Sequence, residues 1–368
     1  MLQNKKLWGI TVKQIMNNTL SPLQLAVLML CARCFSMMTY FPFTGSNALV
    51  FMIAIAISAA LQGILLIPAA VLCSRRDKGL CEIAFCTSRA LGLLVSGAFL
   101  LYFIWDIFIT TGTFAYFMDS YFSNQIARLP AVICAGGAAL YLGGMSSSVL
   151  GKCAGIFFCI FAFFAGILVL SAITYPDTAN FHLAQRDIPN ALANDIKGEF
   201  IRNRELGMLV FLLGDVKGSK PKSVVSYLAL KLVILEVLLG FAALVLGEFA
   251  LATDTPFFYL SCLSNSSVVE RYDAGFMSVW TVLAVVRLAA VLHCCARCVR
   301  LLTGGSAKGA AVYAVQIIPA AATLYLLSKR RWKGLAYLNE SPWLLVCAVG
   351  LIPLALMLVK KRRVKVED

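Results

Sequence analysis

The sequence predicts an all-α membrane protein whose ten transmembrane helices form two inverted halves of five. Hydrophobic residues make up 60% of the 368 residues and charged residues only 14%, with a mean hydropathy of +0.84. A soluble domain has about 25% charged residues. Apolar segments long enough to cross a bilayer recur along the chain. The first and sixth elements are short, so each half begins with an interrupted element, as in proteins built from inverted repeats.

The first half of this single transmembrane domain covers residues 21–175 and follows a polar segment, 1–20, that we expect in the cytoplasm. Cytoplasmic and external sides alternate with each crossing, so the hydrophilic stretch 176–202 is predicted to be an external loop. Most apolar stretches here approach the roughly 20 residues that a membrane helix needs. The five segments are 23–40, 48–73, 90–117, 130–150 and 156–175.

The second half, residues 203–359, opens on an apolar run of only eight residues, Leu206–Leu213. Three charged residues and an asparagine, at positions 202–205, come directly before it. A half-length segment led in by charge is typical of a broken membrane helix, whose exposed backbone faces a ligand near the midplane. A short re-entrant or interfacial helix is the alternative. Four further segments follow at 224–251, 276–302, 310–327 and 342–359.

The distribution of Lys and Arg predicts that both termini are cytoplasmic. With the N-terminus inside, the larger share of the 32 Lys and Arg residues falls on the inner side, including the basic tail in residues 360–368. Such a bias sets membrane orientation. The basic cluster Lys329–Lys333 falls on the outer side and breaks the rule. Either it binds an anionic group there, or one helix near the end is miscounted.

Ionisable residues at membrane depth are costly and are functional candidates for that reason. Arg33, Asp106, Glu236 and Arg287 lie deep within their segments. Asp106 shares one helical face with Tyr102, Thr110 and Thr113, at the i−4, i+4 and i+7 positions. This stripe predicts either the wall of a ligand cavity or an interhelical hydrogen-bonded seam.

We expect Arg33 and Arg287 to pair with Asp106 and Glu236, because buried charges are usually compensated. Alternatively, one arginine holds a substrate carboxylate or replaces a bound cation. Asp106 and Glu236 are the proton-relay candidates, since arginine stays protonated. Lys231 lies nearer a helix end and is interpreted as a structural residue that reaches the interface.

Several functions are not predicted. The chain has no phosphate-binding glycine loop and only two histidines, so we expect neither an enzyme nor a cofactor. The pairs Cys31-x-x-Cys34 and Cys295-x-x-Cys298 have metal-like spacing, but the remaining ligands of a zinc site are lacking. The net charge of +14 sits largely in loops and the tail, which argues against a nucleic-acid partner.

Three stretches resemble the spore germination receptor B subunits, also called endospore germination permeases. The first runs from Leu20-Ser21-Pro22 to Thr39-Tyr40-Phe41-Pro42, and the second from Asn203-Arg204-Glu205-Leu206 to Val216-Lys217-Gly218. The third joins Glu270-Arg271-Tyr272-Asp273-Ala274 to Phe276-Met277-Ser278-Val279-Trp280. Their order, the chain length and the ten-segment layout carry the likeness, which covers roughly residues 20 to 300.

The resemblance implies a leucine-transporter-like fold within the amino acid–polyamine–organocation superfamily. It also implies a nutrient sensor in the inner membrane of bacterial spores, assembled with an A-type membrane subunit and a C-type lipoprotein. The nutrient, typically an amino acid, would bind between helices 1, 3, 6 and 8. The ligand-binding candidates are Arg33, Cys34, Ser36, Tyr102, Asp106, Thr110, Asn203, Arg204, Glu205, Gly207, Trp280 and Arg287.

One feature departs from related transporters, which open the first helix with glycines. Residues 31–38 contain no glycine, so Arg33 is the alternative contact for an anionic group. Two functions remain open at this point. The chain is either a receptor subunit that binds a nutrient without turnover, or a secondary transporter coupled to protons through Asp106 or Glu236.

Overall fold

The computed structural model describes residues 19–39, 47–121, 125–172, 188–247, 249–250, 253–263, 272–305, 309–328 and 343–359. Regular structure in these ranges is helical, apart from one parallel backbone bridge between Leu20 and Val216. The all-α prediction is therefore confirmed for the described residues. Residues 1–18, the basic cluster Lys329–Lys333 and the tail 360–368 lie outside them.

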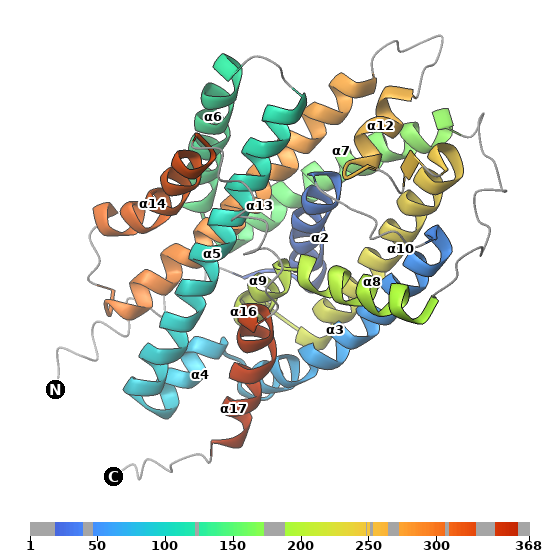
Figure 1. Cartoon of the computed structure of the whole chain (residues 1–368). Helices are drawn as coiled ribbons and strands as arrows, with labels where there is room; N and C mark the ends of the chain where they lie inside the picture. The colour runs from blue at the N-terminus through green and yellow to red at the C-terminus, as the bar shows by residue number, and fades with distance from the viewer. Residues whose placement is uncertain are drawn as a thin grey trace, which may run out of the picture.

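The helices follow one another in a simple order (Figure 1). Their bounds are α2 (Pro22–Thr39), α3 (Ala48–Arg76), α4 (Leu80–Thr87), α5 (Arg89–Tyr121), α6 (Gln125–Gly143), α7 (Ser147–Ala172), α8 (Ile188–Arg202), α9 (Glu205–Leu212), the 3-10 turn η2 (Leu213–Asp215), α10 (Lys220–Leu246), α12 (Pro256–Leu263), α13 (Tyr272–Leu302), α14 (Gly309–Ser328), α16 (Trp343–Val346), the π-helical turn η3 (Cys347–Leu351) and α17 (Ile352–Leu358).

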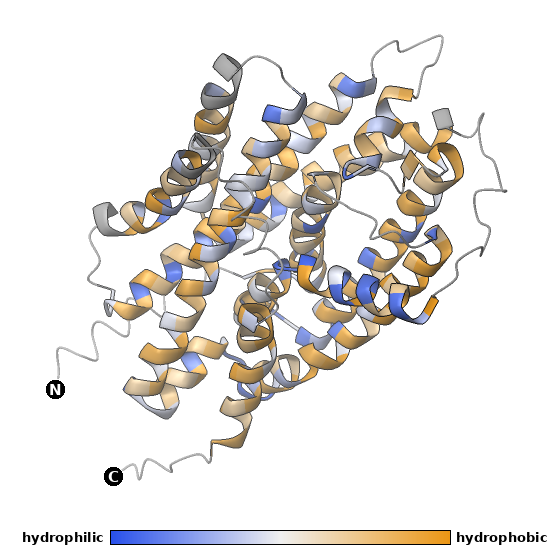
Figure 2. Ribbon diagram, in the orientation of Figure 1, coloured by the Kyte–Doolittle hydropathy of each residue, from blue (hydrophilic) through white to orange (hydrophobic). Residues whose placement is uncertain are grey.

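Six of the described helices are long and apolar enough to cross a membrane: α2, α3, α5, α7, α10 and α13. Shorter apolar helical stretches occupy 130–143, 312–325 and 343–358. Figure 2 shows that hydrophobic residues dominate these ribbons, while hydrophilic positions gather along α8 and near the centre. The protein is thus a multi-pass, all-α membrane protein. The count of ten crossings and the inverted repeat stay predictions.

The order of elements is similar in the two halves. A short helix of eight residues, α4, stands between α3 and α5, and a second helix of eight residues, α12, stands between α10 and α13. Each short helix packs against the long helix that follows it. This layout is what an internal repeat would produce, although it does not by itself relate the halves by symmetry.

Helix α2 lies in the middle of the bundle and is packed by α7, α9, α10 and α13 (Figure 1). Residues Leu25 to Phe35 are all buried, so this helix has no lipid-facing side along its middle. It runs without interruption from Pro22 to Thr39. The predicted break of helix 1 is therefore not in its apolar segment, and residues 40–46 lie outside the described part.

Two predicted boundaries need correction. The stretch 176–202, predicted to be an external loop, contains α8, a helix of fifteen residues that packs against α3. The fourth and fifth segments meet at residues 144–146 and not near residue 150. Gly151 lies inside α7. A Cβ there would stand 2.5 Å from the Leu20 side chain, so this glycine permits close packing.

Candidate functional site at the break between α8 and α9

Helical hydrogen bonding is interrupted between Arg202, where α8 ends, and Glu205, where α9 begins, while Arg204 keeps helical dihedral angles. The turn is tight, because the Leu206 N–H donates to the Asn203 carbonyl at 3.2 Å. The interruption lies where the sequence predicts it. Helix α9 has eight residues, all buried. At 1.5 Å per residue it is about 12 Å long, which is under half the ~30 Å hydrocarbon core.

Side chains from other elements satisfy the backbone carbonyls at this break. Arg33 Nη1 donates to the Arg202 carbonyl at 3.3 Å, and Tyr102 Oη donates to the Arg204 carbonyl at 2.5 Å. The Asn203 amide donates to the carbonyl of Glu199, one turn earlier. Within a membrane an unsatisfied carbonyl costs several kcal/mol. The Arg204 carbonyl also accepts from the Gly207 N–H at 3.2 Å, and the donors from α2 and α5 add to the stability of the break.

The first part of the site surrounds Glu199, near the end of α8. Arg33 Nη2 contacts both Glu199 carboxylate oxygens, at 2.8 and 2.6 Å. Asn203 Nδ2 donates to Glu199 Oε1 at 2.9 Å and its Oδ1 accepts from Lys231 Nζ at 3.0 Å. Lys231 also donates to Gln62 and lies 3.9 Å from the Glu199 carboxylate. Arg202 Nε lies 4.0 Å from the same carboxylate, so three cations share Glu199.

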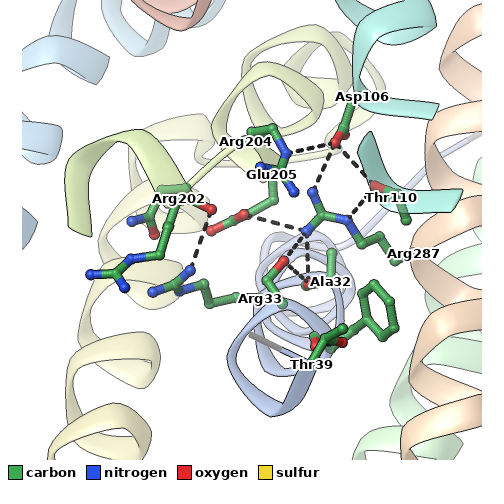
Figure 3. Close-up of polar contacts among 12 residues, drawn as sticks. Ala32, Arg33, Thr39, Asp106, Thr110, Arg202, Arg204, Glu205 and Arg287 are labelled. Atoms are coloured by element: carbon green, nitrogen blue, oxygen red, sulfur yellow. Dashed lines mark hydrogen bonds and ion pairs between the residues drawn. The ribbon is translucent and has the colours of Figure 1, made fainter. Parts of the chain in front are cut away.

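The second part surrounds Asp106, in the middle of α5 (Figure 3). Asp106 Oδ1 accepts from Arg204 Nε at 3.1 Å and from Arg287 Nη2 at 2.9 Å. The Thr110 hydroxyl, one turn along α5, donates to the same oxygen at 3.2 Å. Asp106 therefore joins α13 to the break, and here two cations share one carboxylate.

Glu205 at the start of α9 lies between the two parts. Its Oε1 accepts from the Tyr227 hydroxyl at 2.6 Å, and its Oε2 lies 3.6 Å from Arg287 Nη1. Its negative charge also favours the N-terminus of α9. Glu205 Oε2 and Asp106 Oδ2 are buried and accept no hydrogen bond from the described residues. Spare acceptor capacity therefore remains beside Arg287.

These residues form one set, which we name the central cluster. Arg33, Asp106, Glu199, Glu205 and Arg287 have no exposed surface. A ligand can reach them only after the surrounding helices move apart. The members are Arg33, Gln62, Asp106, Thr110, Glu199, Asn203, Arg204, Glu205, Tyr227, Lys231 and Arg287.

The structure brings seven of the twelve ligand-binding candidates into the central cluster, and Tyr102 and Ser36 contact its members. Ser36 Oγ accepts from Arg287 Nη1 at 2.6 Å. Gly207 packs so closely on Tyr102 that a Cβ would stand 2.2 Å from the ring. Cys34 is buried in α2, and no described residue hydrogen-bonds its thiol.

Trp280 lies outside this hydrogen-bond network. Its indole N–H donates to Thr39 at 2.8 Å, and its ring stacks on Phe114 at a centroid distance of 4.7 Å. Phe117 and Phe35 complete an aromatic group around it. Trp280 stands seven residues before Arg287 on α13, which puts both on one helical face. This aromatic group therefore lies next to the central cluster.

Two predictions about charge are wrong. Arg33 pairs with Glu199 and not with Glu236. Lys231 is fully buried in the central cluster, where it has three polar neighbours, and does not reach the interface. Glu236 is half-buried on α10, with no described hydrogen bond. The proton-relay role of Asp106 and Glu236 stays a prediction.

Four members of the central cluster were missed as site residues: Gln62, Glu199, Tyr227 and Lys231. Two signals could have found them. Ser58 and Gln62 lie one turn apart in the apolar second segment, as do Tyr227 and Lys231 in the seventh, so each pair marks a polar face. Asp195, Glu199 and Arg202 recur at helical spacing within the stretch predicted to be a loop.

A second, partly buried polar group lies where η2 ends, and we name it the end cluster. Arg297 on α13 pairs with Asp215 and, at 3.1 Å, with Glu82 on α4. The Ser147 hydroxyl donates to Asp215 Oδ2 at 2.7 Å and lies 3.1 Å from His293 Nε2. The end cluster fastens η2 to α4, α7 and α13.

Among the described residues, no group of three His, Cys, Asp or Glu side chains is arranged to hold a metal ion. Comparisons with protein-family models and with curated proteins found no match to this chain. Function therefore has to be argued from the site itself and from the resemblance of the sequence stretches.

Proposed function

We propose that this protein is the nutrient-sensing B subunit of a spore germination receptor, which binds a small nutrient at the central cluster. The observation that carries the proposal is the meeting of Arg33, Asp106, Arg204, Glu205 and Arg287 around a break in a membrane helix. Buried ionisable residues in a bilayer mark ligand or ion sites. The three family-like stretches support the same assignment.

The charges of the central cluster suit a zwitterionic ligand such as an amino acid. Glu205 Oε2 and Asp106 Oδ2 have acceptor capacity for an ammonium group. Arginine can take a carboxylate in a bidentate pair. Because the cluster is closed to solvent, binding requires helices α2, α5, α9 and α13 to separate, and that movement would be the signal passed to an A-type subunit and a C-type lipoprotein.

The proposal places the chain in the spore inner membrane, with both termini on the cytoplasmic side. A germination assay tests it, using spores in which this chain is the only B-type subunit. We expect Arg204→Ala and Asp106→Asn, compared at protein levels matched by blot, to need more nutrient. A hydrogen bond to a charged group contributes about 1.5–3 kcal/mol, so the half-maximal concentration should rise about 10- to 100-fold.

The matched control is Glu82→Gln, which removes a carboxylate from the end cluster and leaves the central cluster intact. Its nutrient dependence should stay at the wild-type value. If Arg204→Ala and Asp106→Asn accumulate and respond as the wild type does across the nutrient panel, the proposed site is wrong.

A proton-coupled amino acid transporter of the same superfamily is the second candidate. The observation that favours it is the presence of three buried carboxylates, on Asp106, Glu199 and Glu205, in one membrane-embedded network. Proteoliposomes with an imposed pH gradient separate the two functions. A transporter accumulates labelled amino acid in the proteoliposomes, and Glu205→Gln should abolish this accumulation. A receptor binds the nutrient without accumulating it.

A further inference from the structure

The guanidinium of Arg287 is surrounded by oxygen atoms that come from three other helices (Figure 3). Helix α2 supplies one carbonyl and one hydroxyl, α5 supplies one carboxylate and one hydroxyl, and α9 supplies a second carboxylate. The contacts are Ala32 O at 2.8 Å, Ser36 Oγ at 2.6 Å, Asp106 Oδ1 at 2.9 Å, Thr110 Oγ1 at 3.1 Å and Glu205 Oε2 at 3.6 Å.

The hydroxyl hydrogens of this shell point away from Arg287. Ser36 donates its hydrogen to the Ala32 carbonyl at 3.3 Å, and Thr110 donates to Asp106 at 3.2 Å. Both hydroxyls therefore turn lone pairs towards the guanidinium. Carboxylates, hydroxyls and carbonyls are the ligands that hard metal cations take in proteins. Apart from its occupant, the shell has the chemistry of a cation site.

An ordinary ion pair does not require such a shell. Asp106 and Glu205 are the two carboxylates that balance Arg204 and Arg287, so the neutral oxygens of the shell are not needed for charge balance. The additional contacts with Ala32 and Ser36 tie the guanidinium to α2, the central helix. Without Arg287 the shell would hold two carboxylates against Arg204 alone, and one uncompensated charge in a membrane interior destabilises the fold strongly.

We infer that Arg287 is a built-in cation: its guanidinium occupies a site for a monovalent cation formed by α2, α5 and α9. The protein consequently binds neither sodium nor potassium there, and its stability and nutrient response do not depend on either ion. Removing the side chain leaves a site that takes up a free cation, and guanidinium fits best because it matches the planar group that the shell holds.

Thermal unfolding of the purified full chain in lipid nanodiscs tests this inference. Unfolding is followed by tryptophan fluorescence at constant ionic strength in choline, sodium or potassium chloride. We expect the wild-type Tm to be the same in all three salts. Arg287→Ala should unfold at lower temperature, and millimolar guanidinium, far below denaturing concentrations, should raise its Tm in a saturable manner, as a ligand of the folded state does.

Arg300→Ala is the matched control, because it removes an exposed arginine from the same helix. Its Tm should respond to no cation. Arg287→Lys provides a second variant should Arg287→Ala not fold. The lysine keeps the positive charge but lacks the planar set of N–H donors of the guanidinium. We therefore expect a lower Tm than wild type and a weaker guanidinium response than in the alanine variant.

Two results would overturn the inference. One is a saturable effect of sodium or potassium on the wild-type Tm, which would show that the stability of the folded protein depends on a bound alkali cation. The other is a folded Arg287→Ala protein whose Tm responds to guanidinium no more than that of Arg300→Ala. Neither measurement uses a nutrient, so the inference can fail while the proposed receptor function stands, and the reverse also holds.

Discussion

The central cluster and the end cluster use the same chemistry at different depths. In the central cluster the Arg287–Asp106 pair has no exposed surface on either side chain. In the end cluster Arg297 is 19% exposed and its partner Glu82 is 27% exposed. Breaking a fully buried pair leaves an uncompensated charge, whereas water and salt screen a partly exposed pair. Position, and not pairing alone, therefore decides what each charge contributes.

The largest effect is expected where a central pair is broken. Arg33→Met removes one counter-ion of the buried Glu199 carboxylate, and Glu199→Gln removes the counter-ion of the buried Arg33 guanidinium. Each single variant should lose about 3–5 kcal/mol of unfolding free energy. The double variant should lose clearly less than the sum, because neither charge is then left alone. Unfolding in nanodiscs measures the cycle, and strict additivity would contradict the buried-pair argument.

Intermediate effects are expected at two glycines, one beside each cluster. A Cβ on Gly207 would meet the Tyr102 ring at 2.2 Å, whereas a Cβ on Gly214 would meet the Gly79 backbone at 2.4 Å. Overpacking costs about 1–3 kcal/mol, and a side chain can move more easily than a backbone. Gly214→Ala should therefore destabilise more than Gly207→Ala.

Gly97→Ala is the control for both glycine variants, because nothing lies within 4 Å of a Cβ built there. It should be neutral or stabilising by up to about 1 kcal/mol, since alanine is the better helix former. A Tyr102→Ala background should remove most of the cost of Gly207→Ala. If Gly207→Ala lowers the unfolding free energy equally in the wild-type and Tyr102→Ala backgrounds, the Tyr102 ring is not the group that clashes.

The smallest effect is expected at the exposed side of the end cluster. Glu82→Gln removes one of the two carboxylates of Arg297 and leaves Asp215 in place. The loss should be about 0.2–1 kcal/mol and should shrink as salt is added. The Arg33→Met loss should hardly change with salt. A salt-independent Glu82→Gln effect would remove the distinction between the two clusters.

The sequence predicted residue types better than partners. Arg33, Asp106 and Arg287 stand out because a charge in an apolar helix has few harmless explanations. The partner of Arg33 was not predictable in this way, because Glu199 lies in a stretch whose hydrophilic composition resembles a loop. Amphipathic helices that cover a buried site have such a composition, and only the helical spacing of their charges distinguishes them.

The break at the sixth element was predictable from length and charge, but the donors that stabilise it were not. Tyr102 and Arg33 reach the carbonyls of residues about 100 and 170 positions away in the chain. Such long-range contacts leave no local pattern. The continuity of α2 was not predicted, because the short first segment and the family resemblance both indicated an interruption, whereas the lack of glycine in this helix favours an unbroken one.

The backbone bridge at Leu20 joins the start of α2 to the residues that end η2. The Leu20 N–H donates to the Asp215 carbonyl and the Leu20 carbonyl accepts from the Lys217 N–H, both at 2.9 Å. A displacement of α2 along its axis would therefore act on the end of η2, where Asp215 pairs with Arg297. The link therefore couples the central helix of the bundle to the end cluster.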